Sequence, residues 1–170
     1  LPILFVWFYI LAFPFWAVGY LLAARRGKDM FYRFVATDLT IHFICFICFI
    51  LIPTTNIRPE IPGNTLSEKI LALVYSLDGG NSPSNLFPSI HCYVSWMCWK
   101  GVEGSEKVPK WYQRFSLVFA ILIIISTQVL KQHYIVDAAA ALLLVEFFWR
   151  FYQKGQRHKW VVHVFAHKKK

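Results

Sequence analysis

The chain has 170 residues, of which 57% are hydrophobic and 18% aromatic, and its mean hydropathy is +0.46. A soluble domain rarely reaches that apolar share, so the composition indicates an integral membrane protein. The formal net charge of +9 would suggest nucleic-acid binding in a soluble protein, but no separate basic domain or groove-reading motif accompanies it. We therefore predict a single all-α, polytopic membrane helix bundle over residues 1–170, with no nucleic-acid partner.

Five apolar segments predict membrane spans, at residues 2–24, 34–53, 87–99, 115–130 and 134–152. A helix rises 1.5 Å per residue, so about 20 residues cross a hydrocarbon core of about 30 Å. The segment 87–99 is shorter than that and polar at its start, so we expect it in the centre of the bundle. Because the sequence begins at Leu1 within an apolar run, we also expect a further helix upstream.

The longest polar connection, residues 54–86, is rich in Pro, Gly, Asn and Ser. Within it, residues 66–77 have the apolar spacing of a short amphipathic helix at the membrane interface. Asp78, Asn81 and Asn85 are typical of turn and cap positions rather than of catalysis. Long connections in compact proteins are often functional, so this loop is a candidate part of the site.

The distribution of basic residues predicts the orientation. Of the 18 Lys and Arg residues, 15 fall near 25–33, 100–114 and 150–170, whereas only Arg58, Lys69 and Lys131 fall on the other side. Cytoplasmic loops carry an excess of Lys and Arg. We therefore expect a plasma or inner membrane protein with the basic tail 153–170 in the cytoplasm. The 54–86 loop and the 131–137 turn then face outside.

Five ionisable residues come to that outer side, and together they suit phosphoryl transfer. On a helix, Asp137 lies one turn after His133 and can hold one ring nitrogen while the other attacks. His91 can protonate a leaving oxygen, and Arg58 and Lys131 can neutralise phosphoryl oxygens. No carboxylate-rich Mg²⁺ cage is visible in the sequence, so we expect neither a metal nor another cofactor.

The same residues stand in recognisable motifs. Phe87-Pro88-Ser89-Ile90-His91 and Ser126-Thr127…His133-Tyr134-Ile135-Val136-Asp137, with Arg58-Pro59 upstream, resemble the three signature motifs of the type 2 phosphatidic acid phosphatase (PAP2) superfamily. That superfamily also includes vanadium haloperoxidases and soluble acid phosphatases. The resemblance implies a six-helix membrane core, here lacking its first helix, and metal-independent transfer through a phosphohistidine.

Residue by residue, the resemblance implies a role for each matched position. His133 is the expected nucleophile, Asp137 its orienting carboxylate and His91 the acid toward the leaving group. Arg58 and Ser89 match phosphate-binding positions, and Ser89 with Pro88 is expected to open a helix whose free N–H groups favour an anion.

Three positions depart from the family pattern. Leu51, Ile90 and Thr127 stand where the motifs usually have lysine, glycine and arginine. If residues 127–131 are helical, Lys131 returns to nearly the face of Thr127, about 400° later, so we interpret it as a substitute phosphate clamp. The remaining candidate polar groups of the site are Thr54, Thr55, Ser126 and Thr127.

We predict a lipid phosphatase acting on an isoprenyl (pyro)phosphate, phosphatidylglycerophosphate or phosphatidic acid. An alternative is a lipid head-group phosphotransferase, because the Lys131-Gln132-His133-Tyr134 run with Asp137 also resembles the inositol-phosphoceramide and sphingomyelin synthases. A third hypothesis, a non-enzymatic haem-binding bundle with His91 and His133 as paired ligands, explains neither Arg58 nor Lys131.

Overall fold

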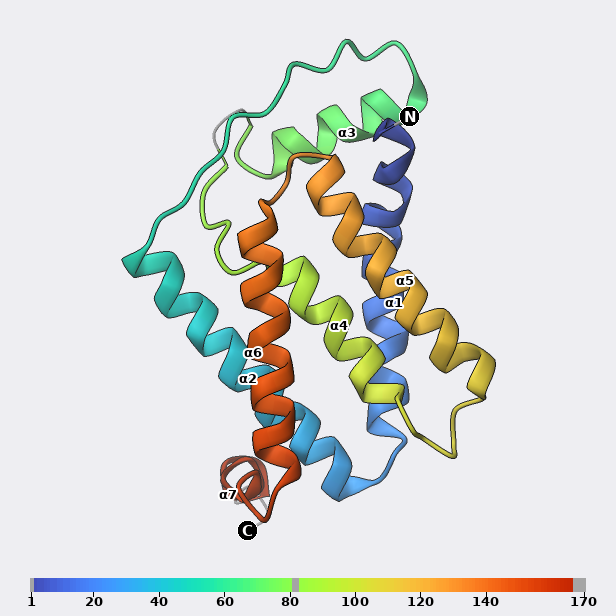
Figure 1. Cartoon of the computed structure of the whole chain (residues 1–170), viewed down its shortest axis with the longest axis vertical. Coiled ribbons are helices and arrows are strands. Elements are labelled where there is room, and N and C mark those ends of the chain that lie inside the picture. Colours follow the sequence, from blue (N-terminus) through green and yellow to red (C-terminus); the bar gives the residue numbers. More distant parts are fainter. Residues whose placement is uncertain (1, 81–82, 167–170) are drawn as a thin grey trace.

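The computed structural model describes residues 2–80 and 83–166, and these residues form helices and connections without a β-strand. The predicted all-α bundle is therefore confirmed (Figure 1). A short 3₁₀ turn, η1 (Pro2–Phe5), leads into seven α-helices: α1 (Val6–Ala24), α2 (Lys28–Leu51), α3 (Leu66–Leu77), α4 (Ile90–Val102), α5 (Lys110–Val129), α6 (Ile135–Gln153) and α7 (Lys159–Ala166).

The predicted helices exist, but two of them begin earlier than the hydropathy indicated. The helix α2 starts at Lys28 rather than at 34, and α5 starts at Lys110 rather than at 115. Lysine and arginine are good helix formers, so the first polar residues outside an apolar core do not end a helix. The helices begin instead after Gly27, whose φ is 116°, and after Pro109.

The helix α4 lies in the centre of the bundle, as its short apolar stretch predicted, and it contacts α1, α2, α5 and α6. Small residues permit this close packing. A Cβ atom added to Gly19 of α1 would lie 2.6 Å from Cys98 Sγ, and one added to Gly101 would lie 3.0 Å from the Phe34 ring. The position of α4 places the residues at its start, including His91, inside the bundle rather than on its surface.

The helices α1 and α2 meet at the turn 25–27 and diverge toward the other end of the molecule (Figure 1). At that end α3 lies across the top of α1 and packs against it, with Val6, Tyr9, Leu71, Val74 and Tyr75 in one buried cluster. A capping box formed by Thr65 and Glu68 begins α3. The backbones of α1 and α2 are therefore close together at the 25–27 turn and farther apart at the end where α3 lies.

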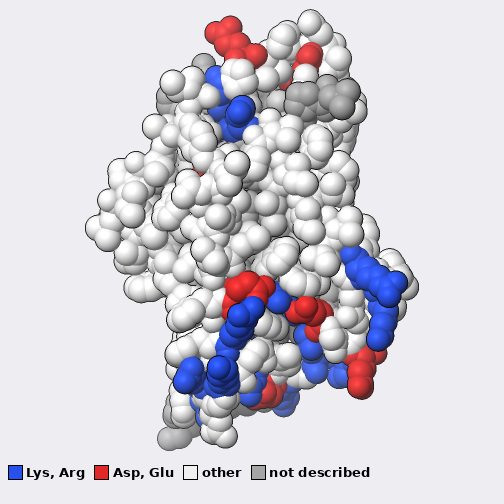
Figure 2. Space-filling view, viewed as in Figure 1, with Lys and Arg blue, Asp and Glu red and all other residues white. Residues whose placement is uncertain are grey.

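Three described helices are long and apolar enough to cross a membrane: Ile3–Ala24, Lys28–Leu51 and Lys110–Val129. The helix α4 has only 13 residues, and α6 carries Asp137, Glu146 and Arg150, so the predicted count of five spans stays a prediction. Charged side chains gather at the two ends of the molecule and leave a broad uncharged band between them (Figure 2). This arrangement is typical of a membrane-embedded bundle.

The basic segment after α6 contains a helix that the sequence did not predict. This helix, α7 (Lys159–Ala166), packs against α2. Just before it, His158 Nε2 lies 2.9 Å from Asp29 Oδ1, and at the end of α6 Tyr152 O accepts from Arg33 Nη1 at 2.8 Å. Residues 167–170 of the predicted tail and Asn81 of the predicted turn lie outside the described residues.

Candidate active site

A cavity of about 510 Å³ opens where α1 and α2 diverge, and both predicted catalytic histidines line it. The His91 and His133 ring centroids are 6.1 Å apart. Aromatic side chains of α1 form one wall and Phe49 of α2 stands on the other side; the α1 residues are Tyr9, Phe13 and Trp16. The fold thus brings together two histidines that are 42 positions apart in the sequence.

A backbone carbonyl fixes the His133 ring. His133 Nδ1 lies 3.0 Å from Leu86 O. Because a carbonyl oxygen only accepts hydrogen bonds, Nδ1 carries the proton and donates it, and Nε2 keeps its lone pair. Asp137 Oδ2 lies farther away, 3.6 Å from the same Nδ1, where it acts as a charge rather than as the hydrogen-bond partner.

The geometry of His133 and Asp137 differs from the single helical turn that their spacing suggested. The helix α6 begins at Ile135, so His133 precedes it. Asp137 Oδ2 accepts from Tyr134 N at 2.8 Å, a capping bond that holds the carboxylate beside the histidine. Thr127 O accepts from the backbone N of both Gln132 and His133, at 2.9 and 3.1 Å, and fixes the turn from the other side.

His91 is held by aromatic stacking at the start of α4. Its ring stacks on Tyr9 at 4.5 Å between centroids and lies 5.1 Å from the Trp16 ring. Its Nε2 is buried, and no atom of the described residues forms a hydrogen bond with it. That nitrogen therefore has an unsatisfied hydrogen-bonding capacity at the edge of the cavity.

Ser89 is the N-cap of α4, as the sequence predicted for a helix start. Its side chain accepts from Cys92 N at 3.3 Å, and its backbone N donates to Asp137 O at 3.2 Å. These two bonds join the starts of α4 and α6. Ser89 is fully buried and does not line the cavity, so a phosphate-binding role for it stays a prediction.

Arg58 is buried in a network behind the cavity wall. Its Nη1 donates to Asp78 O at 3.0 Å and Gly80 O at 3.1 Å, and its Nη2 donates to Asp78 Oδ2 and Gln132 Oε1. The guanidinium also lies 4.6 Å from the centre of the Tyr75 ring. Three of these bonds thus join residues within the 54–86 loop, and the bond to Gln132 holds that loop to the 131–137 turn. Phosphate binding by Arg58 stays a prediction.

Lys131 does not occupy the position that helical geometry suggested. The helix α5 ends at Val129, and Lys131 has φ 53°, so it does not return to the face of Thr127 one turn later. Its side chain is exposed and does not line the cavity, while its carbonyl accepts from Asn56 Nδ2 at 2.6 Å. The prediction that residues 127–131 are helical was wrong. That Lys131 binds the substrate phosphate stays a prediction.

The remaining candidate hydroxyl groups bond to the backbone. Thr54 Oγ1 accepts from Leu86 N and Phe87 N at 3.1 and 3.0 Å, so it holds the peptide whose carbonyl binds His133. Thr55 pairs with Ser84 in an isolated bridge. Ser126 Oγ and Thr127 Oγ1 donate to carbonyls one turn earlier in α5.

Sequence reasoning missed several residues of the site. The Leu86 carbonyl is a backbone atom, and the stacking residues Tyr9 and Trp16 belong to a uniformly apolar segment, so neither had a sequence signal. Asp78 was interpreted as a turn and cap residue, and it is the C-cap of α3; it also lines the cavity and binds Arg58, which the sequence did not indicate. Among residues 2–80 and 83–166, no group of three or more His, Cys, Asp and Glu side chains is placed to hold a metal ion.

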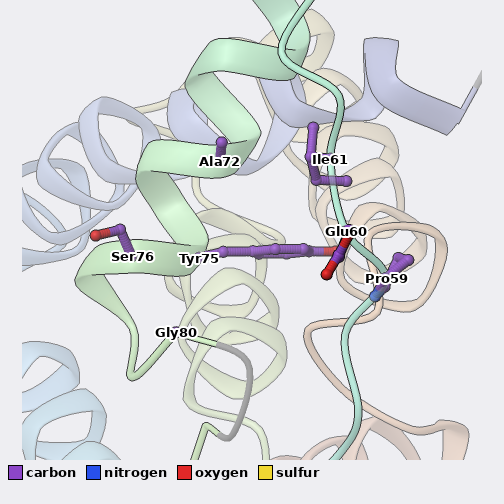
Figure 3. A pocket seen from close by; sticks show the side chains of 7 residues that line it. All are labelled: Pro59, Glu60, Ile61, Ala72, Tyr75, Ser76 and Gly80. Carbon is purple, nitrogen blue, oxygen red and sulfur yellow. The ribbon is translucent and has the colours of Figure 1, made fainter.

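A second cavity, of about 460 Å³, lies between residues 59–61 and α3 (Figure 3). The Tyr75 ring points from α3 toward Glu60 and Pro59 across this space. Tyr75 donates to Leu130 O at 2.7 Å, and burial raises the pKa of its hydroxyl, which keeps it a donor. Neither histidine lines this cavity. The residues in its walls belong to the 54–86 loop, which they connect to α3 behind the active site.

A family model described as the PAP2 superfamily matches residues 1–150. The chain belongs to the PAP2 superfamily. This is a phosphatase-type family, and its membership together with the long apolar helices identifies the chain as an integral membrane protein of phosphatase type. The match includes His91, His133 and Asp137. Neither the comparison with curated proteins nor that with solved structures gave a match.

Proposed function

We propose that this PAP2 protein is a metal-independent lipid phosphatase that hydrolyses a phosphorylated membrane lipid through a phosphohistidine at His133. One observation carries the proposal: the two histidines face one cavity with their ring centroids 6.1 Å apart, and Leu86 O occupies Nδ1 of His133. Nε2 of His133 is then the free nucleophile. In a reactive complex, phosphorus would lie about 3 Å from that nitrogen.

The reaction has two steps. His133 Nε2 attacks phosphorus and forms the P–N bond as the P–O bond to the lipid breaks, and His91 gives a proton to the leaving oxygen. Water then attacks phosphorus, His91 takes a proton from it, and the P–N bond breaks to release phosphate. Asp137, 3.6 Å from Nδ1, stabilises the positive charge that develops on the His133 ring.

The walls of the cavity support a lipid substrate. Phe13, Trp16, Phe49 and Ile90 line it, and they come from α1, α2 and α4. An acyl or prenyl chain can remain among these apolar side chains while its phosphate reaches the histidines. Isoprenyl (pyro)phosphate, phosphatidylglycerophosphate and phosphatidic acid all have this form. The positive-inside rule puts the site on the non-cytoplasmic face.

A head-group phosphotransferase is the second candidate, and the charge of the cavity favours it. Among the described residues that line the cavity there is no Lys or Arg, and the one carboxylate is Asp78. A phosphodiester carries less charge than a phosphomonoester and needs fewer cations. A mass-tagged head group that appears on an added acceptor lipid would identify transfer, and a Soret band in the purified protein would instead favour the haem-binding hypothesis.

The test is phosphate release in detergent from a panel of phosphorylated lipids, with and without an acceptor lipid. We expect His133→Ala to abolish turnover and His91→Ala to lower kcat by about a hundredfold or more, since general acid catalysis contributes that much. His163→Ala, an exposed histidine of α7, is the matched control and should leave turnover unchanged.

Two further measurements separate the mechanism from its rivals. Wild-type protein quenched in alkali during turnover should carry labelled phosphate, and His133→Ala should not. EDTA should leave the rate unchanged. Substantial turnover by His133→Ala would overturn the nucleophile, and a strict Mg²⁺ requirement would overturn the metal-independent mechanism.

A further inference from the structure

The end of α6 opposite the histidines carries a groove of about 370 Å³ with no role in the proposed reaction. Three cationic side chains line it, from Arg150, Lys154 and Arg157, together with the single carboxylate of Glu146. Lys154 and Arg157 lie beyond the residues that the family model matches. The groove therefore begins within the matched residues and extends beyond them.

Its cations are only partly compensated. Glu146 lies 3.5 Å from Arg150 Nη2, but the same carboxylate also accepts from Trp96 Nε1 at 2.9 Å and lies 3.0 Å from Lys100 Nζ. In the part of the chain that the structure describes, no carboxylate pairs with Lys154 or Arg157. The groove thus presents positive charge that an anion can neutralise.

The groove is built by two segments. Leu143, Phe147 and Phe151 follow one another at intervals of four residues and share a face of α6. After α6, the left-handed conformation of Gly155, φ 65°, turns the chain, and Arg157 lies over the Phe151 ring at 4.2 Å. Arg157, the third cation, therefore lies in the turn after α6 and packs back against that helix.

Along this face the side chains change from apolar to basic. Leu143 and Phe147 are 70% and 62% exposed, and Arg150 and Lys154 follow toward the end of the molecule where the basic residues gather (Figure 2). From residue 143 to residue 154 a helix rises about 16 Å. A lipid has the same order, with acyl chains in the membrane and a phosphate at its surface, whereas a free anion would leave the apolar half unused.

We infer that this groove binds one anionic phospholipid of the leaflet opposite the active site. Its phosphate lies among Arg150, Lys154 and Arg157, and an acyl chain packs along Leu143 and Phe147. Basic pockets at the membrane surface bind anionic head groups in this way. The site is separate from His91 and His133 and does not depend on the proposed reaction.

The test counts retained lipid by native mass spectrometry, with the full chain released from nanodiscs of equal phosphatidylglycerol and phosphatidylcholine. In the wild type we expect one phosphatidylglycerol to be retained over phosphatidylcholine. The triple variant Arg150→Gln, Lys154→Gln and Arg157→Gln should reduce that retention by about fivefold or more. The matched control is a second triple variant that loses three exposed cations at the same end: Arg25→Gln, Lys28→Gln and Lys110→Gln.

A second variant, Leu143→Ser with Phe147→Ser, removes only the apolar half and should also reduce retention. Monodisperse elution and an unchanged thermal midpoint verify that each variant is folded. Equal loss of lipid in the control triple variant would overturn the site in favour of general surface charge. Binding of glycerol phosphate as tight as that of the lipid would assign the groove to a free anion and overturn the inference.

Discussion

The reactivity of His133 depends on an atom that belongs to another segment. Leu86 O accepts from His133 Nδ1 at 3.0 Å, and Thr54 Oγ1 holds this segment by accepting from Leu86 N and Phe87 N. Thr54 therefore acts on the reaction as a positioning residue, without touching the cavity. Its contribution is the orientation of one carbonyl, which selects the nitrogen that attacks.

Thr54→Val tests this arrangement because it keeps the side-chain shape and removes the acceptor. Two backbone N–H groups then lose their partner, and the Leu86 carbonyl is free to move. We expect kcat for phosphate release to fall by about tenfold or more, since small displacements of reacting groups are costly. Thr54→Ser should restore most of the rate.

The control for Thr54 is Thr40→Val, whose hydroxyl bonds Tyr152 OH at 2.8 Å away from the cavity. Full activity of Thr54→Val would contradict the positioning role. The ¹⁵N shifts of the His133 ring add a readout that a general loss of stability would not move: in the wild type they should report a proton on Nδ1.

Site residues that act through their side chains could be predicted from the sequence. Groups of the site that belong to the backbone could not. His91 and His133 stand in spaced motifs, and the fold brings their rings within 6.1 Å. The Leu86 carbonyl has no residue identity that a sequence could reveal. Lys131 was misplaced because the prediction extended α5 past Val129, where the chain instead turns at φ 53°.

At the scale of elements, Arg58 joins three segments. Its bonds to Asp78 and Gln132 connect its own segment, the end of α3 and the 131–137 turn. His133 lies in the 131–137 turn, and the Leu86 carbonyl that binds its ring lies in the same 54–86 connection as Arg58. The guanidinium is buried, so its removal takes the donor from the buried Gln132 amide and from the carbonyls of Asp78 and Gly80.

We expect Arg58→Ala to lower the free energy of unfolding by about 3 kcal/mol, since hydrogen bonds to charged groups contribute about 1.5–3 kcal/mol each and are only partly replaced by water. Thermal unfolding of the substrate-free protein in detergent measures this. Lys69→Ala, an exposed cation on α3, should change stability by less than about 0.5 kcal/mol. An Arg58→Ala variant with unchanged stability and lost activity would instead assign Arg58 to phosphate binding alone.

Helix type was easier to predict than helix extent. The residues of α3 were predicted in full because their apolar periodicity coincides with a capping box at Thr65 and Glu68. The starts of α2 and α5 were predicted five or six residues late, because hydropathy marks the membrane boundary and helical hydrogen bonding continues beyond it. The helix α7 was missed because eight residues give barely two turns of periodicity.

At the scale of the whole molecule, most of the basic residues and the histidine cavity lie at opposite ends. The histidine cavity opens beside α3, and the Lys and Arg residues gather beyond the other ends of α1, α2 and α6 (Figure 2). Of the 15 Lys and Arg residues in the described part of the chain, 12 lie at that second end. Such an asymmetry sets the orientation of a membrane protein, so the cavity should face away from the cytoplasm.

Cysteine labelling of intact cells tests this orientation with two single substitutions at exposed positions. Glu60→Cys lies at the histidine end, and Glu106→Cys lies in the connection between α4 and α5. A membrane-impermeant maleimide should label the Glu60→Cys protein directly and the Glu106→Cys protein only after permeabilisation. The natural Cys45, Cys92 and Cys98 are buried and Cys48 is half-buried, so both substitutions are made in a Cys48→Ser chain, whose own labelling is the background. Labelling in the opposite pattern would place the histidines in the cytoplasm, where a lipid phosphate of the inner leaflet would be the substrate.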